Sequence, residues 1–399
     1  MEQSTTANPE GTRGPTGTGG MRGTASMGDA AAMGDTAAMG DTAGAGDAAS
    51  TGPLDLAEAL DLLPKVELHC HVEGTMRPGT VLELARRHGL ALPTENLDEL
   101  YSYTSLNEFL SIFWLVQSTL GGRDDWARLG YESVVDAAAH GRVYAEMFFT
   151  PARHLDTGQR LADIVSGLAD GIAAAEAETG ARAMLIADID RAFGPAPGLQ
   201  MVTELGELRR SGSPGIERVL GVGMDSTELG VDPKSFTKAY RAAAGFGFRL
   251  TGHQGENSPA SAIAEVIDVL GAERIDHGLS LVDDPELVRR FAAERIPLTV
   301  CPNSNIRIAN AFPALAQHPY PAMRAAGLLA TLNTDDPAMT DLDLGYEYAS
   351  VAEAFDYTFD DMVTIALDGV DATWLADDAK HALRTRVTAE AAALATRMD

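Results

Sequence analysis

The sequence predicts an α/β protein built as a (β/α)8 TIM barrel. After residue 54, eight short runs rich in Val, Ile, Leu, Phe and Ala recur, as expected of parallel strands buried on both faces. The predicted strands are 66–71, 143–150, 183–189, 219–225, 248–253, 274–277, 297–301 and 328–333. Helical periodicity separates most of them, in the stretches 79–88, 162–178, 233–244, 261–270 and 285–294. Eight strands that alternate with helices favour a closed barrel.

The positions of polar residues favour the barrel over a doubly wound open sheet. The open sheet usually carries a glycine-rich phosphate-binding turn after its first strand, and this sequence has none there. Chemically active side chains stand instead at the ends of the predicted strands, namely His69, His71, His253, His277, Asp335 and Asp336. Barrel enzymes gather their catalytic groups at the carboxyl ends of the strands, so we expect these residues to converge.

Three histidines and one aspartate of this set suit a metal ion. His69 and His71 are two residues apart in a strand, so both imidazoles project from the same face. Cys70 projects from the opposite face, which makes it a packing residue rather than a ligand. His253 adds a third imidazole and Asp335 a carboxylate, a donor set that suits zinc with one open position. We therefore expect one Zn²⁺ per chain.

The first 53 residues differ from the rest of the chain. Met-Gly-Asp recurs at 27–29, 33–35 and 39–41 within a run of small and polar residues. Such a segment has no large side chains to bury, so it cannot offset the entropy of ordering. The sequence predicts a disordered tail over residues 1–53 and one barrel domain over residues 54–399.

Charge and composition exclude several classes of partner. The net charge of −28 repels phosphate backbones, so we expect no nucleic-acid binding. No membrane span is expected, because the sequence has no run of about twenty apolar residues. Only Cys70 and Cys301 are present, which excludes a disulfide framework and favours a cytoplasmic protein. The expected partner is a small-molecule substrate, and the sequence leaves the oligomeric state open.

Five motifs connect these residues to a known family. They are PKVELHCHVEGT at 64–75, HQGE at 253–256, ERIDHG at 273–278, LTVCPNSN at 298–305 and LNTDDP at 332–337. Their types and order resemble the adenosine and adenine deaminase family, and the resemblance covers almost everything after the tail. It implies a barrel with a zinc site that removes the amino group of a 6-aminopurine by hydrolysis.

The resemblance implies a role for each site residue. The zinc ligands would be His69, His71, His253 and Asp335. Glu256 would donate a proton to N1 of the purine, and His277 would orient and deprotonate the attacking water. The remaining substrate contacts would come from Asp336 (to N7), Glu73, Glu228 and Gly223, and Ser304 would support Asp335.

The chemistry of deamination explains why a carboxylic acid is needed at Glu256. Adding hydroxide to C6 of an aromatic ring is uphill, and a proton on N1 makes the ring a better electrophile. The donor must stay protonated near pH 7, and burial beside an apolar purine raises the pKa of a carboxyl group. Glu256 lies three residues after His253, so we expect it near the metal but not bound to it.

Two interpretations of the substrate stay open. Glu228 stands where adenosine deaminases typically have a small glycine, and Glu73 where they commonly have an aspartate that holds the ribose 5′-hydroxyl. Both longer residues resemble the adenine deaminases, and a carboxylate at 228 would accept the N9–H of free adenine. Adenosine users dominate the family as a whole, so the main interpretation is adenosine, or a 5′-modified or deoxy adenosine, converted to the inosine-type product and ammonia. The alternative is adenine, converted to hypoxanthine.

Two further features bear on the pocket. Gln254 replaces the alanine that the family usually has at this position. The apolar segment 105–120 predicts a helix on the barrel that also lids the pocket, with Phe109, Phe113 or Trp114 near the purine. The other histidines are expected to be structural or at the surface; they are His88, His140, His154, His318 and His381.

Three alternative functions fit the sequence less well. A two-metal amidohydrolase usually has a bridging lysine at the end of the fourth strand, and residues 221–226 contain none. The nucleobase deaminases that carry His-x-Glu and Pro-Cys-x-x-Cys are excluded because that signature is absent. A relative that binds purines without turnover would be expected to have lost a ligand, Glu256 or His277, and all of them are present.

Overall fold

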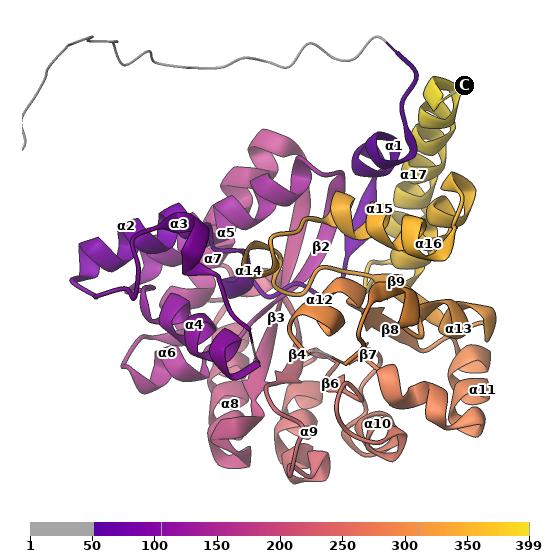
Figure 1. Ribbon diagram of the computed structural model, residues 1–399. Helices are drawn as coiled ribbons and strands as arrows, with labels where there is room; N and C mark the ends of the chain where they lie inside the picture. The colour runs from indigo at the N-terminus through magenta and orange to yellow at the C-terminus, as the bar shows by residue number, and fades with distance from the viewer. Residues whose placement is uncertain (1–51, 105, 310, 399) are drawn as a thin grey trace, which may run out of the picture. The chain divides into compact units, whose positions relative to one another are not determined.

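The computed structural model describes residues 52–104, 106–309 and 311–398. In this part of the chain, parallel strands stand at the centre and helices surround them, which confirms the predicted α/β barrel (Figure 1). The strands are β1 Lys65–Glu67, β2 Arg142–Phe149, β3 Arg182–Asp190, β4 Val219–Asp225, β5 Arg249–Leu250, β6 His253–Gln254, β7 Ile275–His277, β8 Pro297–Val300 and β9 Leu329–Leu332. The tail that we predict over residues 1–53 lies almost wholly outside the described residues.

The strand segments of the described chain fill eight positions around the barrel. β1 to β5 form one parallel sheet and β6 to β9 another. The fifth predicted strand is divided at Thr251 and Gly252 into β5 and β6, and Thr251 N donates to Val222 O at 3.1 Å, which keeps this strand beside β4. The barrel closes where Cys70 pairs with Asp335 as an isolated parallel bridge.

The first predicted strand is shorter than expected because other groups replace part of its ladder. Leu68 N donates to Oδ1 of the Asn333 side chain at 2.7 Å. Beyond it, Asp335 N donates to His69 O at 3.1 Å and His71 N donates to Asp335 O at 2.8 Å. These bonds hold the segment that carries the two histidines directly against the segment that carries Asp335.

Helices follow the strands and cover the outside of the barrel. The α-helices are α1 Leu56–Leu62, α2 Pro78–His88, α3 Leu97–Leu100, α4 Leu106–Ser118, α5 Arg123–Ala138, α6 Ala152–Asp156, α7 Leu161–Thr179, α8 Pro195–Ser211, α9 Thr237–Gly245, α10 Ala260–Glu265, α11 Pro285–Glu294, α12 Pro302–Arg307, α13 Tyr320–Ala325, α14 Pro337–Thr340, α15 Leu344–Phe355, α16 Phe359–Ala372 and α17 Asp377–Met398. All five predicted helical stretches contain a helix, namely α2, α7, α9, α10 and α11. A 3-10 helix, Pro233–Phe236, precedes α9, and a π-helix, Val266–Leu270, follows α10. Within the described residues, no helix combines the length and apolarity that crossing a membrane requires.

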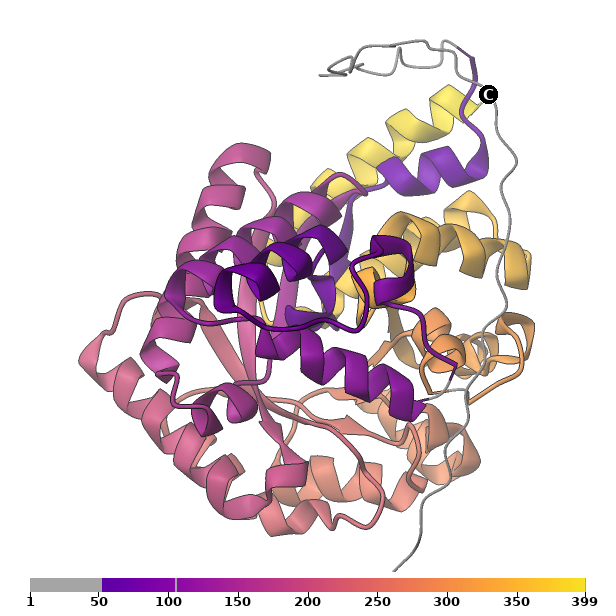
Figure 2. The same ribbon diagram turned by 60° about the vertical axis from the view of Figure 1, so that its left-hand side comes forward.

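The apolar segment that we predict as a lid forms α4, which lies across the front of the strands (Figure 2). Phe109 of α4 packs with Ile308, just after α12, and with Met339 of α14. α12 follows β8 and α14 follows β9 along the chain. Trp114 is 42% exposed, and the guanidinium carbon of Arg153 lies 4.3 Å from the centre of its ring. Phe109 is therefore placed near the barrel mouth, whereas Trp114 lies at the surface; a lid function of α4 stays a prediction.

Candidate active site

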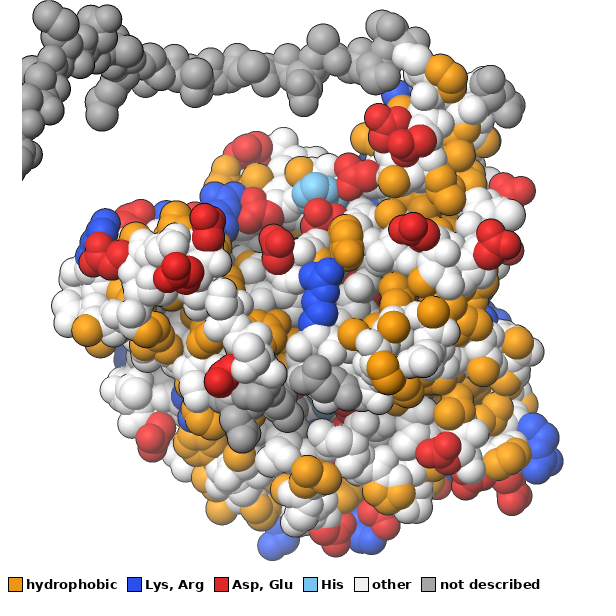
Figure 3. Space-filling view, in the orientation of Figure 1, with side chains coloured by type: hydrophobic (Ala, Val, Ile, Leu, Met, Phe, Trp, Pro, Cys, Tyr) orange, Lys and Arg blue, Asp and Glu red, His pale blue; other side chains and the backbone are white. Residues whose placement is uncertain are grey.

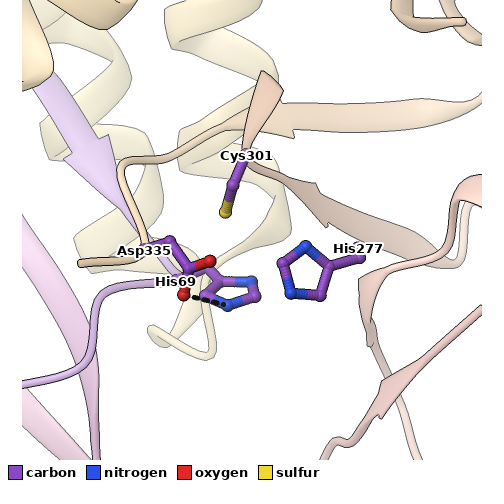
Figure 4. A group of neighbouring side chains, drawn as sticks. All are labelled: His69, His277, Cys301 and Asp335. Carbon is purple, nitrogen blue, oxygen red and sulfur yellow. Dashed lines mark ion pairs between the residues drawn. The ribbon is translucent and has the colours of Figure 1, made fainter. Parts of the chain in front are cut away.

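Four side chains converge at the carboxyl ends of the strands. Nε2 of His253 lies 3.1 Å from Nε2 of His69 and 3.1 Å from Nε2 of His71. Oδ1 of Asp335 lies 3.3 Å from Nε2 of both His69 and His71. All four residues are buried. His69 and Asp335 face each other, with His277 and Cys301 beside them (Figure 4).

The hydrogen bonds of the imidazoles leave this cluster suited to hold a cation. Nδ1 of His69 lies 3.1 Å from Thr299 O, and Nδ1 of His253 lies 3.1 Å from Met224 O. A carbonyl oxygen only accepts, so both Nδ1 atoms carry the hydrogen and both Nε2 atoms present lone pairs. Two lone pairs at this distance repel each other unless a positive ion lies between them. Ligands about 2.0–2.1 Å from one zinc ion are about 3.3 Å apart, so the donor set fits a metal ion in type and in spacing.

Backbone strain accompanies the site. Asp335 and His277 have φ angles of 68° and 64°, in the left-handed region that non-glycine residues rarely adopt. Such strain persists only where surrounding contacts enforce it, and it concentrates at functional sites. Ser304 Oγ donates to Oδ2 of Asp335 at 2.6 Å, which leaves Oδ1 turned toward the histidines.

Glu256 and His277 lie together beside the cluster. Oε1 of Glu256 is 3.8 Å from Nδ1 of His277, and the Glu256 side chain keeps 21% of its surface exposed. Burial raises the pKa of Glu256, and the nearby His277 offsets this only in part. A carboxyl group in this setting stays protonated to higher pH than usual, which suits a proton donor.

Asp336, the neighbour of Asp335 in the chain, is buried as well. Burial raises its pKa well above the usual range, and the charge of Asp335 adds to the effect. Its Oδ1 is buried and has no protein partner. Gly74 makes room for this oxygen, because a Cβ at position 74 would overlap it.

Gly74→Ala is expected to push Asp336 out of place and to lower kcat/KM by about 10-fold, the cost of one substrate hydrogen bond. Gly79→Ala is the matched control, because a Cβ there meets nothing within 4 Å. Steady-state kinetics with the purine substrate checks both variants. Equal kcat/KM values for the two would contradict this role of Gly74.

The two other predicted substrate residues, Glu73 and Gly223, lie at buried carboxyl oxygens that have no protein partner. Glu73 accepts from Thr150 N at 2.9 Å through Oε1, while Oε2 has no protein partner, and burial raises the pKa of Glu73 to about 7. Gly223 lies against Asp188, whose Oδ1 a Cβ at position 223 would overlap. Asp188 is buried with neither oxygen bonded, and no pattern in the sequence singled it out.

Glu228, which we predict as an acceptor for the substrate, bonds mainly to groups of the protein itself. Its Oε2 accepts from Gln254 Nε2 at 2.9 Å, from Gly255 N at 2.8 Å and from the Ser258 hydroxyl, and its Oε1 accepts from Glu256 N at 3.0 Å. Three of these donors are on Oε2 and one is on Oε1, and all four come from residues 254–258. Glu228 therefore holds the loop that carries Glu256. The Gln254 side chain belongs to the same hydrogen-bond network. Its nitrogen donates to Glu228, and its oxygen accepts from Arg191 Nη1 at 3.3 Å.

Glu228→Gln should lower kcat/KM by about 10-fold for every substrate alike, because an amide turns donors toward the loop N–H groups and loosens Glu256. The measurement is the kcat/KM ratio of adenine to adenosine in the variant and in the unmodified protein. An unchanged ratio supports the loop role. A shift of the ratio toward the nucleoside would support the original role of Glu228 as the discriminating residue.

The structure also adds site residues that sequence reasoning missed. Cys301 shares a group with His69, His277 and Asp335 in which the potential ligand atoms lie within 4.8 Å of one another, whereas Cys70 belongs to no such group among the described residues. Asn305 bonds both Glu256 and His277, and His318 bonds Asn305. Cys301 stands at the end of a predicted strand and Asn305 in the motif at 298–305, but no sequence pattern singles out His318.

Comparison with known proteins decides the family. The family model described as "Adenosine deaminase" matches residues 64–390. The chain belongs to the adenosine deaminase family. A relative named adenine deaminase, from Streptomyces coelicolor, is 38% identical over 331 residues, which cover 82% of this chain and 94% of the relative. The resemblance found in the sequence motifs is thereby confirmed.

Solved structures agree with this assignment. The crystal structure of adenine deaminase from Arthrobacter aurescens has a TM-score of 0.77 and 34% identity, and the match covers 82% of this chain and 98% of that one. An amidohydrolase of Burkhoderia ambifaria, solved with bound zinc, has a TM-score of 0.80 and 31% identity over 88% of this chain and 97% of that one. The protein is therefore a hydrolytic aminohydrolase of purines. Its family is one of metal-dependent amidohydrolases.

Proposed function

We propose that the protein hydrolyses free adenine to hypoxanthine and ammonia. The convergence of His69, His71, His253 and Asp335, with Glu256 beside them, carries the proposal. The family as a whole slightly favours adenosine, but Glu228 and Glu73 resemble the adenine deaminases, and the relatives named above with 38% and 34% identity are adenine deaminases. They support the alternative interpretation, which we adopt.

We propose zinc as the metal, held by the same four residues. The donor set of three imidazoles and one carboxylate suits zinc, and the amidohydrolase from Burkhoderia ambifaria was solved with it. When bound, zinc makes hydroxide available near neutral pH.

The protein's own residues supply the proton and the orientation. Water adds to C6 of the ring, so a C6–O bond forms as Glu256 gives its proton to N1. His277 orients the attacking water from its position next to Glu256. One proton of the water passes to the amino group, the C6–N6 bond breaks and ammonia leaves. The other proton of the water, left on the C6 oxygen, returns to Glu256 as the C6 carbonyl of hypoxanthine forms.

The five-membered ring of free adenine offers an acceptor at N7 and a donor at N9. Asp336, with its raised pKa, is an O–H donor suited to N7. Oε2 of Glu73 lacks a protein partner, and we assign it to the N9–H that only the free base carries. A ribose at N9 would remove that donor and leave the Glu73 oxygen unpaired, which costs binding energy.

Carboxyl groups also argue against nucleotides as substrates. Glu73, Asp188, Asp225 and Asp336 each have a buried oxygen without a protein partner. Arg191 lies close by, but four of its five N–H donors are used by Asp225 O, Met224 O, His253 O and the Gln254 side chain. Acidic side chains are also spread over the visible face of the molecule (Figure 3). A phosphate would therefore meet buried carboxyl groups that offer it no cationic partner, and Arg191 has at most one N–H group left to bind it.

An assay of ammonia release with adenine, adenosine, 2′-deoxyadenosine and AMP tests the proposal. We expect kcat/KM for adenine to exceed that for either nucleoside by about 10-fold or more, because the nucleosides leave a buried acceptor unpaired. AMP should be the poorest of the four. Adenosine as the best substrate would restore the nucleoside interpretation, and no ammonia from any of them would overturn the proposed function.

A further inference from the structure

We infer that Asn305 is a positioning residue of the deamination reaction, and that His318 sets the direction of its amide. Asn305 lies in α12 and is fully buried between the loop that carries Glu256, the end of β7 and the His318 ring. The inference rests on the proposed function, because it concerns how the proton donor is held for its reaction with N1.

The positions of the oxygen and the nitrogen in the Asn305 side chain follow from a series of hydrogen bonds that starts at Tyr320 N. Tyr320 N can only donate, and it donates to Nδ1 of His318 at 3.1 Å. The neutral His318 ring therefore carries its hydrogen on Nε2. Burial lowers the pKa of His318 to about 4, which keeps the ring neutral at working pH. Nε2 then donates to Oδ1 of Asn305 at 3.2 Å.

Because Oδ1 of Asn305 faces His318, the donor Nδ2 faces Glu256 and His277. Nδ2 of Asn305 lies 2.9 Å from Oε1 of Glu256 and 3.2 Å from Nδ1 of His277. Its two hydrogens can serve these two acceptors at once.

Each of these bonds selects one arrangement of the reacting groups. Because Oε1 of Glu256 accepts from Asn305, the transferable proton of Glu256 belongs on Oε2. Because Nδ1 of His277 accepts as well, the neutral His277 ring carries its hydrogen on Nε2. A ring in this state donates through Nε2, which fits the orientation of the attacking water rather than its deprotonation.

His318 belongs to the histidines that the sequence predicts to be structural or at the surface, and the inference adds a positioning role to it. It is buried, and a single residue separates it from both Glu256 and His277. Backbone hydrogen bonds hold Asn305 in place. Asn305 N donates to Cys301 O at 2.9 Å, and Ala311 N donates to Asn305 O at 2.9 Å.

The first test replaces Asn305 alone and together with Glu256. Asn305→Ala should lower kcat for adenine by about 10- to 100-fold with a smaller change in KM, since it removes bonds to a proton donor and not to the substrate. In a Glu256→Gln background the same substitution should cost less than about threefold, because residues that act as a unit are not additive.

Asn303→Ala is the matched control for damage to α12. Asn303 lies on the same helix, but its amide donates to Glu347 at 2.8 Å and to Ser350 at 2.9 Å. Its effect on kcat should be the same in the unmodified protein and in the Glu256→Gln background. If Asn305→Ala behaved like this control, with equal losses in both backgrounds, Asn305 would be only structural and the inference would be overturned.

The second test addresses His318 by a conservative exchange. Glutamine can accept from Tyr320 N and donate to Asn305, so His318→Gln should keep kcat within about threefold of the unmodified protein. Phenylalanine fills a similar space but cannot donate, so His318→Phe should lose kcat by about 10-fold while the melting temperature shows a folded protein. Equal kcat values for the two variants would overturn the role of His318.

These outcomes can be told apart from a failure of the proposed function. If the unmodified protein releases no ammonia from adenine, the proposed function fails before any variant is compared. If the unmodified protein deaminates adenine and Asn305→Ala leaves kcat unchanged, the function stands and the inference fails.

Discussion

Glu256→Gln is expected to lower kcat for adenine by about 10²-fold or more while the protein keeps its metal. The amide has nearly the same shape and can still accept from Asn305 Nδ2, so the loop and the cluster should stay in place. It cannot give a proton to N1, and the ring then remains a poor electrophile. The measurement combines steady-state kinetics with the metal content of the purified variant.

The pH dependence sharpens this prediction. Burial raises the pKa of Glu256, and the acid is active in its protonated form, so kcat/KM should fall as the pH rises through that raised pKa. The variant should lack this limb of the profile. Glu286→Gln on the exposed start of α11 is the control and should behave as the unmodified protein does. Loss of metal from Glu256→Gln would mean that Glu256 is a ligand and would contradict the assignment.

The sequence predicts a site residue where the alternation of side chains along a strand, or its place at the carboxyl end of a strand, determines its position. His69 and His71 lie on one face because strand side chains alternate, and this holds although the ladder of β1 ends at Glu67. His253, His277 and Asp335 were expected to meet them because parallel strands in a barrel end on one side, and the structure brings them together.

Residues whose role depends on tertiary contacts could not be predicted in this way. Glu228 bonds the loop of Glu256 across 28 positions, and Asn305 bonds Glu256 across 49. No periodicity links such pairs. The left-handed backbone of Asp335 and His277 was also invisible in the sequence, because it is imposed by neighbouring segments such as the one that bonds His69 O and His71 N.

The thiol of Cys301 raises the question of whether it joins the metal ligands, since it lies in one group with His69, His277 and Asp335. Burial raises the pKa of Cys301 well above its usual range, and the nearby Asp335 carboxylate adds to this effect. The thiol also has a partner in the protein, because Sγ of Cys301 donates to Thr299 O at 3.9 Å. Cys301→Ser should therefore keep the metal and most of the activity.

Asp335→Ala is expected to release the metal and to lower kcat by about 10³-fold or more, because a bound metal supplies several kcal/mol of transition-state stabilisation. Asp335 is the one carboxylate of the set, and without it three imidazole donors remain, with repulsive lone pairs at 3.1 Å. Metal analysis and kinetics of Asp335→Ala, beside Cys301→Ser, check this. A chelator should inactivate the unmodified protein and added Zn²⁺ should restore it, whereas Zn²⁺ should not restore Asp335→Ala. If Asp335→Ala kept a full equivalent of metal while Cys301→Ser lost it, the ligand set would have to include the thiol in place of Asp335.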